Sequence, residues 1–207
     1  MNLKHVFIYF VMAIIFISCG GHKDCNHDHG NGETEVTAQQ WLITSNSAGF
    51  VKLGQQKDDI QLEDEMTMSS ELVDVGEGMQ DTQWFIKKNN TTLLGFFVSQ
   101  QRKGGGVIWE IQVMSSDFKT EESIGVGSSI KEFKTAYSDL NLWFTPYGYH
   151  FVAETSAMPD VQFFIDPKAY TGGDDKLMQP GETISLTESD FNMNGKLVMV
   201  RMFTPYF

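Results

Sequence analysis

The chain has 207 residues, of which 41% are hydrophobic and 20% are charged, and its formal net charge is −12. So acidic a surface repels nucleic acid and anionic lipid headgroups, because binding either one requires clustered lysine and arginine. We therefore expect no nucleic-acid partner. A domain of this length buries about 70% of its unfolded-chain surface, which is enough for a sizeable hydrophobic core.

The N-terminus has the composition of an export signal. Lys4 and His5 precede the unbroken apolar run VFIYFVMAIIFI, residues 6–17. This run is too short to cross a bilayer, which needs about 20 residues, and it suits the apolar core of a signal peptide. Ser18 and Cys19 follow at once, and an apolar run that closes on a small residue and a cysteine resembles the bacterial lipobox. The resemblance implies that Cys19 is lipidated and becomes the first residue of the mature chain.

We therefore expect a signal peptide over residues 1–18 and a flexible tether rich in His, Asp and Gly over residues 19–40. The alternative is an ordinary cleaved signal with an incidental cysteine. The lipobox reading implies an outer-membrane lipoprotein with a lipid anchor (palmitate), either periplasmic or exposed at the cell surface. His-Lys-Asp at 22–24 resembles the charged export tags of Bacteroidota lipoproteins. If Cys19 carries lipid, Cys25 is the only thiol left, and the domain has no internal disulfide.

The tether contains three of the five histidines of the chain. Together with one cysteine they read H-x-x-C-x-H-x-H, and imidazole and thiolate suit zinc or copper ions. The candidate metal ligands are His22, Cys25, His27 and His29. A structural zinc site usually joins two separated ligand pairs across a folded loop, whereas these ligands share one polar segment. A hydrophilic spacer that needs no cofactor therefore stays open beside a zinc or copper site.

Two segments of the domain share a pattern. FVKLGQQKDDI, residues 50–60, aligns with SIGVGSSIKEF, residues 123–133, so that Gly54 falls on Gly127, 73 residues later. In both segments an alternating apolar stretch ends at the glycine and a polar segment begins. Because an internal repeat decides the architecture of a chain, we take this pattern as a frame for the domain.

The second segment predicts a helix. Ser129 and Glu132 form S-x-x-E, the spacing of a capping box at a helix start. Apolar residues then recur at helical spacing, at Ile130, Phe133, Ala136, Tyr137 and Leu140. In the first segment acidic residues dominate QKDDIQLEDE, residues 56–65, which we interpret as a solvated helix or a loop.

Strand patterns follow in each copy. The predicted strands are residues 82–88, 91–100 and 107–115 in the first copy and residues 149–155, 161–167 and 195–203 in the second. Asn89 and Asn90 predict a tight turn, since asparagine tolerates a positive φ. The sequence thus predicts an α+β fold with low helix content. Its mainly antiparallel sheet would come from two tandem strand-helix-three-strand repeats, residues 41–118 and 119–207, in one globular unit.

This order of elements resembles modules of bacterial envelope lipoproteins, among them assembly lipoproteins of the BamE type. It also resembles the tandem helix-plus-sheet units of the β-lactamase inhibitory proteins. The resemblance rests on GSSIKEF, residues 127–133, and on the repeat skeleton over residues 48–203. Those families place the helix before the sheet, whereas here a strand precedes it. The resemblance implies a non-catalytic binding or adaptor module.

The catalytic alternative depends on one histidine. The chain has no G-x-S-x-G, no H-E-x-x-H and no Walker loop. His150, in PYGYHFVAE, is the one histidine beyond the tether. A hydrolase would need His150 beside carboxylates from the nearby loops, and the candidates are Asp160, Asp166, Asp174 and Asp175.

Aromatic side chains supply the candidate binding surface. Exposed aromatic anchors on a sheet face are typical of protein or glycan recognition, although most aromatic residues in strands belong to a core. The candidate binding residues are Trp84, Trp109, Trp143, Tyr147, Tyr149 and His150. We expect a binding module rather than an enzyme, held at the membrane by its lipid and contacting an envelope protein or glycan.

Overall fold

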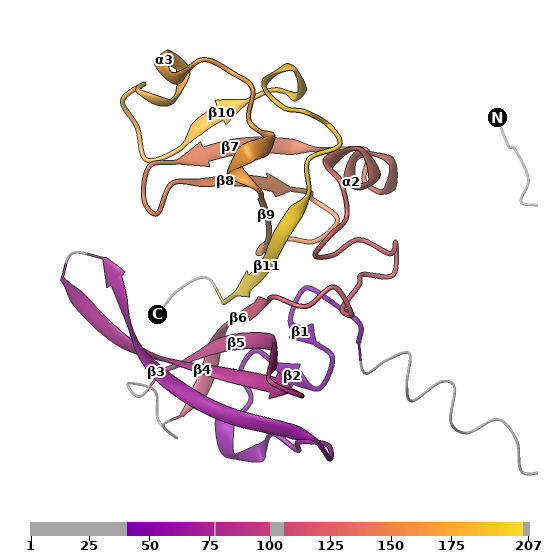
Figure 1. Cartoon of the computed structure of the whole chain (residues 1–207), viewed down its shortest axis with the longest axis vertical. Coiled ribbons are helices and arrows are strands. Elements are labelled where there is room, and N and C mark those ends of the chain that lie inside the picture. The colour runs from indigo at the N-terminus through magenta and orange to yellow at the C-terminus, as the bar shows by residue number, and fades with distance from the viewer. Residues whose placement is uncertain (1–40, 77, 100–105, 205–207) are drawn as a thin grey trace, which may run out of the picture. The chain divides into compact units, whose positions relative to one another are not determined.

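The structure is a computed structural model that describes residues 41–76, 78–99 and 106–204 (Figure 1). The predictions made for the signal peptide and the tether, including Cys19 and the candidate metal ligands, lie outside these residues. Within them, no helix is long and apolar enough to cross a membrane.

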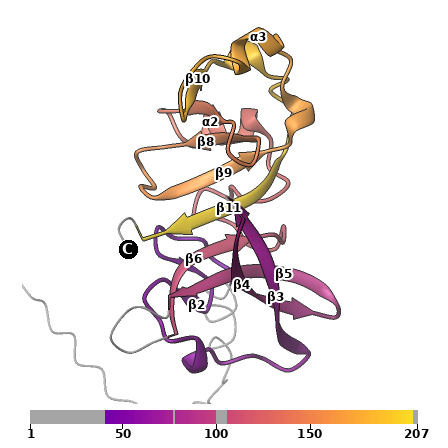
Figure 2. The same cartoon turned by 90° about the vertical axis from the view of Figure 1, so that its left-hand side faces the viewer.

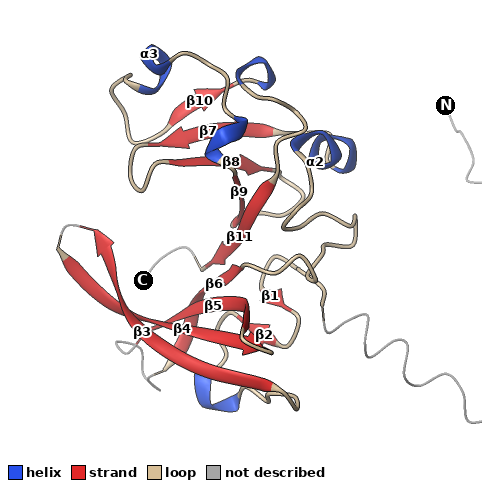
Figure 3. Cartoon of the chain, in the orientation of Figure 1, coloured by secondary structure: helices blue, strands red, loops and turns tan. Residues whose placement is uncertain are grey.

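Nine strands form one antiparallel sheet in the order β10-β7-β8-β9-β11-β6-β5-β4-β3 (Figures 1 and 3). The strands are β3 (Met66–Gly76), β4 (Met79–Lys88), β5 (Thr91–Ser99), β6 (Val107–Val113), β7 (Asn141–Thr145), β8 (His150–Glu154), β9 (Val161–Ile165), β10 (Ile184–Leu186) and β11 (Leu197–Phe203). A separate two-stranded sheet pairs β1 (Ser47–Ala48) with β2 (Val51–Lys52).

Helical structure in the described residues is short. It consists of α2 (Ile130–Ala136), α3 (Asp174–Leu177) and the 3-10 turns η1 (Lys57–Asp59), η2 (Pro167–Ala169) and η3 (Glu188–Asp190). The predicted α+β class, with a mainly antiparallel sheet and little helix, is therefore confirmed.

One face of the sheet carries the hydrophobic core. Residues directly opposite each other on paired strands share a face, so the strand register traces a single apolar row across the sheet. The row runs through Ile86, Leu94, Val113, Val200, Phe163, Ala153, Leu142 and Leu186, all of which are buried. We call this side the core face. Helix α2 packs against it, and the rings of Phe133 and Phe163 lie 4.8 Å apart.

The start of α2 follows the predicted capping box. The Ser129 hydroxyl accepts a hydrogen bond from the Glu132 backbone N–H at 3.1 Å, and the Glu132 carboxylate accepts one from the Ser129 backbone N–H at 2.6 Å. Two backbone donors that the helix itself leaves unpaired are thereby satisfied.

The six predicted strands are confirmed, with ends that differ by a few residues. Three strands of the nine-stranded sheet were not predicted, namely β3, β7 and β10. Strand β3 is mostly exposed and rich in polar residues, so it lacks the apolar alternation that marks a half-buried strand. One expectation was wrong, because residues 123–126 form no strand. The acidic segment 56–65 is a loop that holds the single turn η1, in agreement with the interpretation as a solvated helix or a loop.

The last strands of the two halves, β6 and β11, pair with each other in the interior of the sheet (Figures 1 and 2). Each of these two strands also accepts a backbone hydrogen bond from a glycine earlier in its own half of the chain. The N–H of Gly54 donates to the carbonyl of Ile108 in β6, and the N–H of Gly127 donates to the carbonyl of Leu197 in β11, both at 2.8 Å. Two residues after each glycine, an isolated antiparallel bridge continues the contact: Gln56 pairs with Val107 in β6, and Ser129 pairs with Lys196 just before β11.

Candidate functional site

The opposite side of the sheet carries polar side chains, and we call it the polar face. Its central row passes through Gly95, Gln112, Arg201 and Gln162, on β5, β6, β11 and β9. Gly95 leaves room there for a side chain of the next strand, because a Cβ atom at this position would lie 2.9 Å from Nε2 of Gln83. The Gln83 amide thus reaches across β5 toward β6.

Hydrogen bonds join these side chains on the β4–β6 part of the face. Nε2 of Gln83 donates to Oε1 of Gln112 at 2.9 Å, and Nε2 of Gln112 donates to Oε1 of Glu110 at 2.6 Å. Gln83 and Glu110 are both buried. Buried polar groups that are hydrogen-bonded in this way hold each other in fixed orientations.

Arg201 begins a second chain of hydrogen bonds on the β8–β11 part of the face. Its Nε donates to Oε1 of Gln162 at 3.0 Å, and its Nη2 donates to the same oxygen. Nε2 of Gln162 in turn donates to Oε1 of Glu154 at 3.0 Å. The guanidinium also lies 5.1 Å from the ring centre of Phe164 and 5.4 Å from that of Phe203, within cation–π range.

The charges on this face are held in a partly dehydrated environment. Burial raises the pKa of Glu110 above its ordinary value, although the Arg201 charge and the Gln112 hydrogen bond oppose the shift. Burial likewise lowers the pKa of Arg201, against the attraction of Glu110 and Glu154. No carboxylate of the described residues lies within ion-pair distance of the Arg201 guanidinium. The amide of Gln162 connects the guanidinium to the carboxylate of Glu154.

A pocket of about 270 Å³ opens on the polar face beside Arg201. Trp143 and His150 enter it from β7 and β8, and Tyr147 enters from the turn between them. Its other lining residues are Thr145, Val152, Phe164, Glu182 and Thr183. Three residues that the sequence singled out for binding thus meet a cation that it did not single out.

The setting of His150 favours the neutral form of its imidazole. Burial and the positive charge of Arg201 both lower its pKa below the ordinary value. Its ring lies edge-on to Phe164, with the ring centres 4.9 Å apart. The turn also depends on Gly148, which has a φ of +75° and where a Cβ atom would lie only 2.5 Å from Nε2 of His150. The glycine thus permits the close approach of the imidazole.

The residues proposed for hydrolysis do not come together. No hydrogen bond among the described residues joins His150 to a carboxylate, and none of the four loop aspartates lines its pocket. Asp166 instead accepts a hydrogen bond from the N–H of Lys168 at the start of η2, and Asp174 and Asp175 form the first turn of α3. These aspartates have local backbone roles that loop positions commonly give them.

The other aromatic candidates lie elsewhere. Trp84 is on the core face, opposite Phe96, and the Lys57 ammonium lies 4.4 Å from the centre of its ring. Trp109 packs against Phe97 at a ring distance of 5.7 Å. Tyr149 is exposed, but its ring contacts Phe144, on the side away from the pocket.

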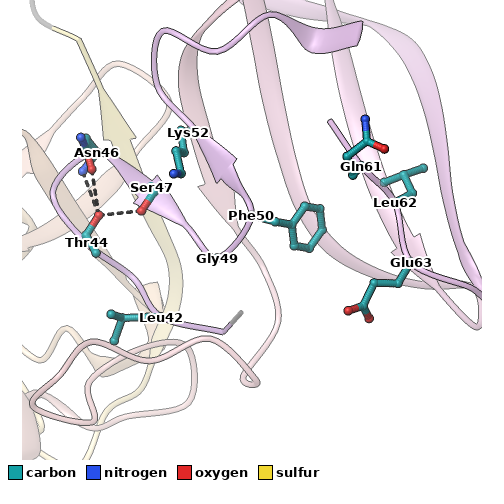
Figure 4. A pocket seen from close by; sticks show the side chains of 10 residues that line it. All are labelled: Leu42, Thr44, Asn46, Ser47, Gly49, Phe50, Lys52, Gln61, Leu62 and Glu63. Carbon is teal, nitrogen blue, oxygen red and sulfur yellow. Dashed lines mark hydrogen bonds between the residues drawn. The ribbon is translucent and has the colours of Figure 1, made fainter. Parts of the chain in front are cut away.

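A larger hollow of about 760 Å³ lies beside β1 and β2 (Figure 4). Three of its polar side chains bond to one another, since Oγ1 of Thr44 is 2.7 Å from Oγ of Ser47 and donates to Oδ1 of Asn46 at 3.0 Å. Phe50 and Leu62 form an apolar part of its wall. We place the candidate site on the polar face, because the smaller pocket there brings aromatic rings, an imidazole and a guanidinium together.

The part of the chain that the structure describes contains no group of three or more His, Cys, Asp and Glu side chains placed to hold a metal. The candidate ligands of the tether lie outside it.

Two residues of the site were missed in the sequence, although a signal for them exists. Arg201 is the one charged residue of the strand LVMVRMF, and Gln162 is the one polar residue of VQFFI. A single polar residue inside an otherwise apolar strand indicates a position that faces away from the core or has a specific partner.

Comparison with known proteins assigns the chain to no family. No model of a protein family matches the chain, and no curated protein matches it. A solved structure that resembles it is the crystal structure of the uncharacterized protein YfeY from Escherichia coli, with 12% sequence identity and a TM-score of 0.49. The match covers 79% of this chain and 99% of YfeY.

Proposed function

We propose that this chain is a lipid-anchored protein of the bacterial outer membrane that acts as a non-catalytic binding or adaptor module. The observation that carries the proposal is the pocket in which Trp143, Tyr147 and His150, all from one hairpin, converge with Arg201 from β11. Tyr147 is 69% exposed there, so its ring is available to a ligand. Aromatic rings beside an arginine make up the composition of binding hot spots.

The ligand would be an envelope protein or glycan that inserts one side chain or one sugar ring. A pocket of this volume encloses a small group rather than a whole drug-sized ligand, which occupies upward of about 300 Å³. Arg201 has N–H groups beyond the two given to Gln162, and the Glu182 carboxylate offers acceptors at the rim. No hydrogen bond of the described residues joins His150 to a carboxylate that would orient its ring, which supports binding over acid–base catalysis.

We also propose that the domain consists of two copies of one unit. The strand order supports this. On one side of the central β6·β11 pair, β6 is followed outward by β5, β4 and β3, and on the other side β11 is followed outward by β9, β8 and β7. The register supports it too, because Val113 pairs with Val200 and Ile111 with Met202 on either side of the Gln112–Arg201 pair. An approximate two-fold axis between Gln112 and Arg201 would exchange the halves. Each copy would then contribute four strands after its polar or helical segment, rather than the three that the sequence predicted there.

The binding proposal is tested by capture from detergent-solubilised envelope. The bait is the full chain with Cys19→Ala, which removes the proposed lipid site. It is compared with the same chain that also carries Trp143→Ala and Tyr147→Ala. Tyr149→Ala is the matched control, because it removes the same side chain from the same turn but outside the pocket.

We expect a specific protein or glycan to be retained by the parent bait and by Tyr149→Ala, and to be lost from the double variant. Equal retention by all three baits would remove the pocket from the proposal. Hydrolytic turnover of a captured glycan or peptide, abolished by His150→Gln, would instead support the enzyme alternative.

A further inference from the structure

The two ends of the nine-stranded sheet differ in how their edges are protected. At one end β10 is only three residues long. At the other end β3 extends over eleven residues, and no strand of the described residues pairs with its outer side. An edge strand presents a row of unpaired backbone N–H and C=O groups, which are a template for another strand.

Strand β3 lacks most of the features that keep edges from pairing. Its sequence, MTMSSELVDVG, contains no proline, lysine or arginine. Its one shift of register, between Asp74 and Gly76, lies at the very end of the strand. Natural sheets usually protect an edge with such residues, with bulges along it, or with a very short strand. Strand β3 carries the carboxylates of Glu71 and Asp74 but has none of these other features along most of its length.

Exposed apolar side chains lie along the same strand. Leu72 is 69% exposed and Val75 is 48% exposed. The register places Met68 opposite Ile86, so Met68 and its neighbours at even positions, including Leu72, lie on the core side of the sheet. Glu71 pairs with Gln83 and lies on the polar side. The edge therefore offers apolar contacts on one side and a carboxylate on the other.

The second half of the domain contains a strand at the corresponding place. Strand β7 is the outermost strand of the β7-β8-β9-β11 group, as β3 is in β3-β4-β5-β6. Strand β10 covers β7 in antiparallel register, with Ile184 opposite Phe144 and Leu186 opposite Leu142. Both apolar side chains of β10 are buried on the core face. The position that β10 fills beside β7 is thus open beside β3, a comparison that rests on the proposed repeat.

We propose that the free edge of β3 binds an extended segment of a partner protein by adding it as a tenth, antiparallel strand. The segment would carry apolar residues at alternate positions, which cover Leu72 and Met68 as Ile184 and Leu186 cover β7. Lysine or arginine would occupy the positions between them, facing Glu71. Backbone hydrogen bonds supply the affinity of such strand addition, and the alternating side chains supply its specificity. The net charge of −12 attracts a basic segment over long range.

The test uses two peptides of identical composition and the full chain with Cys19→Ala. One peptide alternates valine with lysine, and the other places all its valines before all its lysines, so that only the pattern differs. Binding is measured by calorimetry, and its location by hydrogen exchange of the backbone amides. We expect the alternating peptide to bind and to slow exchange over residues 66–76, while exchange in β10 stays unchanged.

Three variants separate the edge from the remaining surface. Leu72→Lys should weaken binding about tenfold, because it replaces an apolar contact by a charge that repels the peptide. Val198→Lys makes the same change at a side chain that is 44% exposed on β11, away from the edge, and should leave binding unaltered. Trp143→Ala, which changes the pocket, should also leave peptide binding unaltered. A failure of the edge proposal is therefore distinguishable from a failure of the pocket proposal.

Three results would overturn the proposal. These are equal binding of both peptides, protection located outside residues 66–76, and an unchanged affinity in Leu72→Lys. A fourth result, protection of β3 that rises with the concentration of the chain alone, would assign the edge to a second copy of this chain and would likewise overturn a basic partner segment.

Discussion

Gly54 and Gly127 adopt the same backbone conformation and make the same contact in the two halves of the domain. Their φ angles are +82° and +84°, and each donates its N–H at 2.8 Å to a carbonyl of the last strand of its own half. A Cβ atom built at either position would meet nothing within 4 Å. The requirement for glycine at both sites is therefore a matter of backbone conformation and not of space.

Substitution of either glycine by valine should lower the free energy of unfolding by more than about 1 kcal/mol, because a β-branched residue at positive φ is strained. The two losses should be similar, and asparagine should cost less at both sites. Urea denaturation measures them. Gly173→Val is the control, since Gly173 also has open space but a φ of −78°. Equal losses at Gly173 and Gly127 would contradict the backbone explanation.

Ser129→Ala should cost about 1 kcal/mol of stability, because it removes the hydroxyl that caps α2. Thermal or urea unfolding checks the value. Ser138→Ala, which removes a hydroxyl from an exposed position just beyond the same helix, should be close to neutral. If both substitutions have the same effect, the capping box does not stabilise the helix.

Glu110 should make stability depend on pH. Because burial holds its pKa above the ordinary value, the folded chain binds more protons than the unfolded chain between the two pKa values. Its contribution to stability is thus complete below the unfolded pKa and is lost as the pH rises through the folded pKa. Urea unfolding of Glu110→Gln between about pH 4 and pH 8 should give a flatter profile than the wild type. Glu121→Gln is the control at an exposed side chain. If it flattens the pH profile of stability as much as Glu110→Gln does, the pH dependence does not arise from Glu110.

Arg201→Gln should raise the pKa of His150, since it removes one of the two causes that lower it. The rise should be partial, because burial of the ring, the larger cause, remains. Titration of the imidazole proton signals by NMR measures this pKa, and Lys196→Gln provides a control at an exposed cation. An unchanged pKa in Arg201→Gln would mean that the guanidinium does not act on the ring.

Cys19→Ala should leave the protein without lipid and recoverable in the soluble fraction. The reason is the apolar run that ends in Ser18 and Cys19. Metabolic labelling with a fatty acid checks the prediction, and Cys25→Ala is the control that retains the lipobox cysteine. Equal incorporation into Cys19→Ala and the wild type would end the lipoprotein hypothesis.

The local features of this protein followed from the sequence alone. The apolar alternation of VIWEIQV predicted β6, and the S-x-x-E spacing predicted the start of α2. The Asn89-Asn90 turn was predicted as well, and both residues have positive φ. These features were accessible because strands, caps and tight turns are determined by residues a few positions apart.

Only the tertiary structure decided which of these elements meet. Arg201 lies beside Gln162 and near His150 because β11 returns to pair with both β9 and β6, and no local pattern encodes that order. The pairing of β4 with β5 places Trp84 on the core face, and the pairing of β7 with β8 places Trp143 on the polar face, although both tryptophans stand in similar strand sequences. Strand partners far apart in the chain are selected by the burial of the whole apolar face, which depends on all nine strands together.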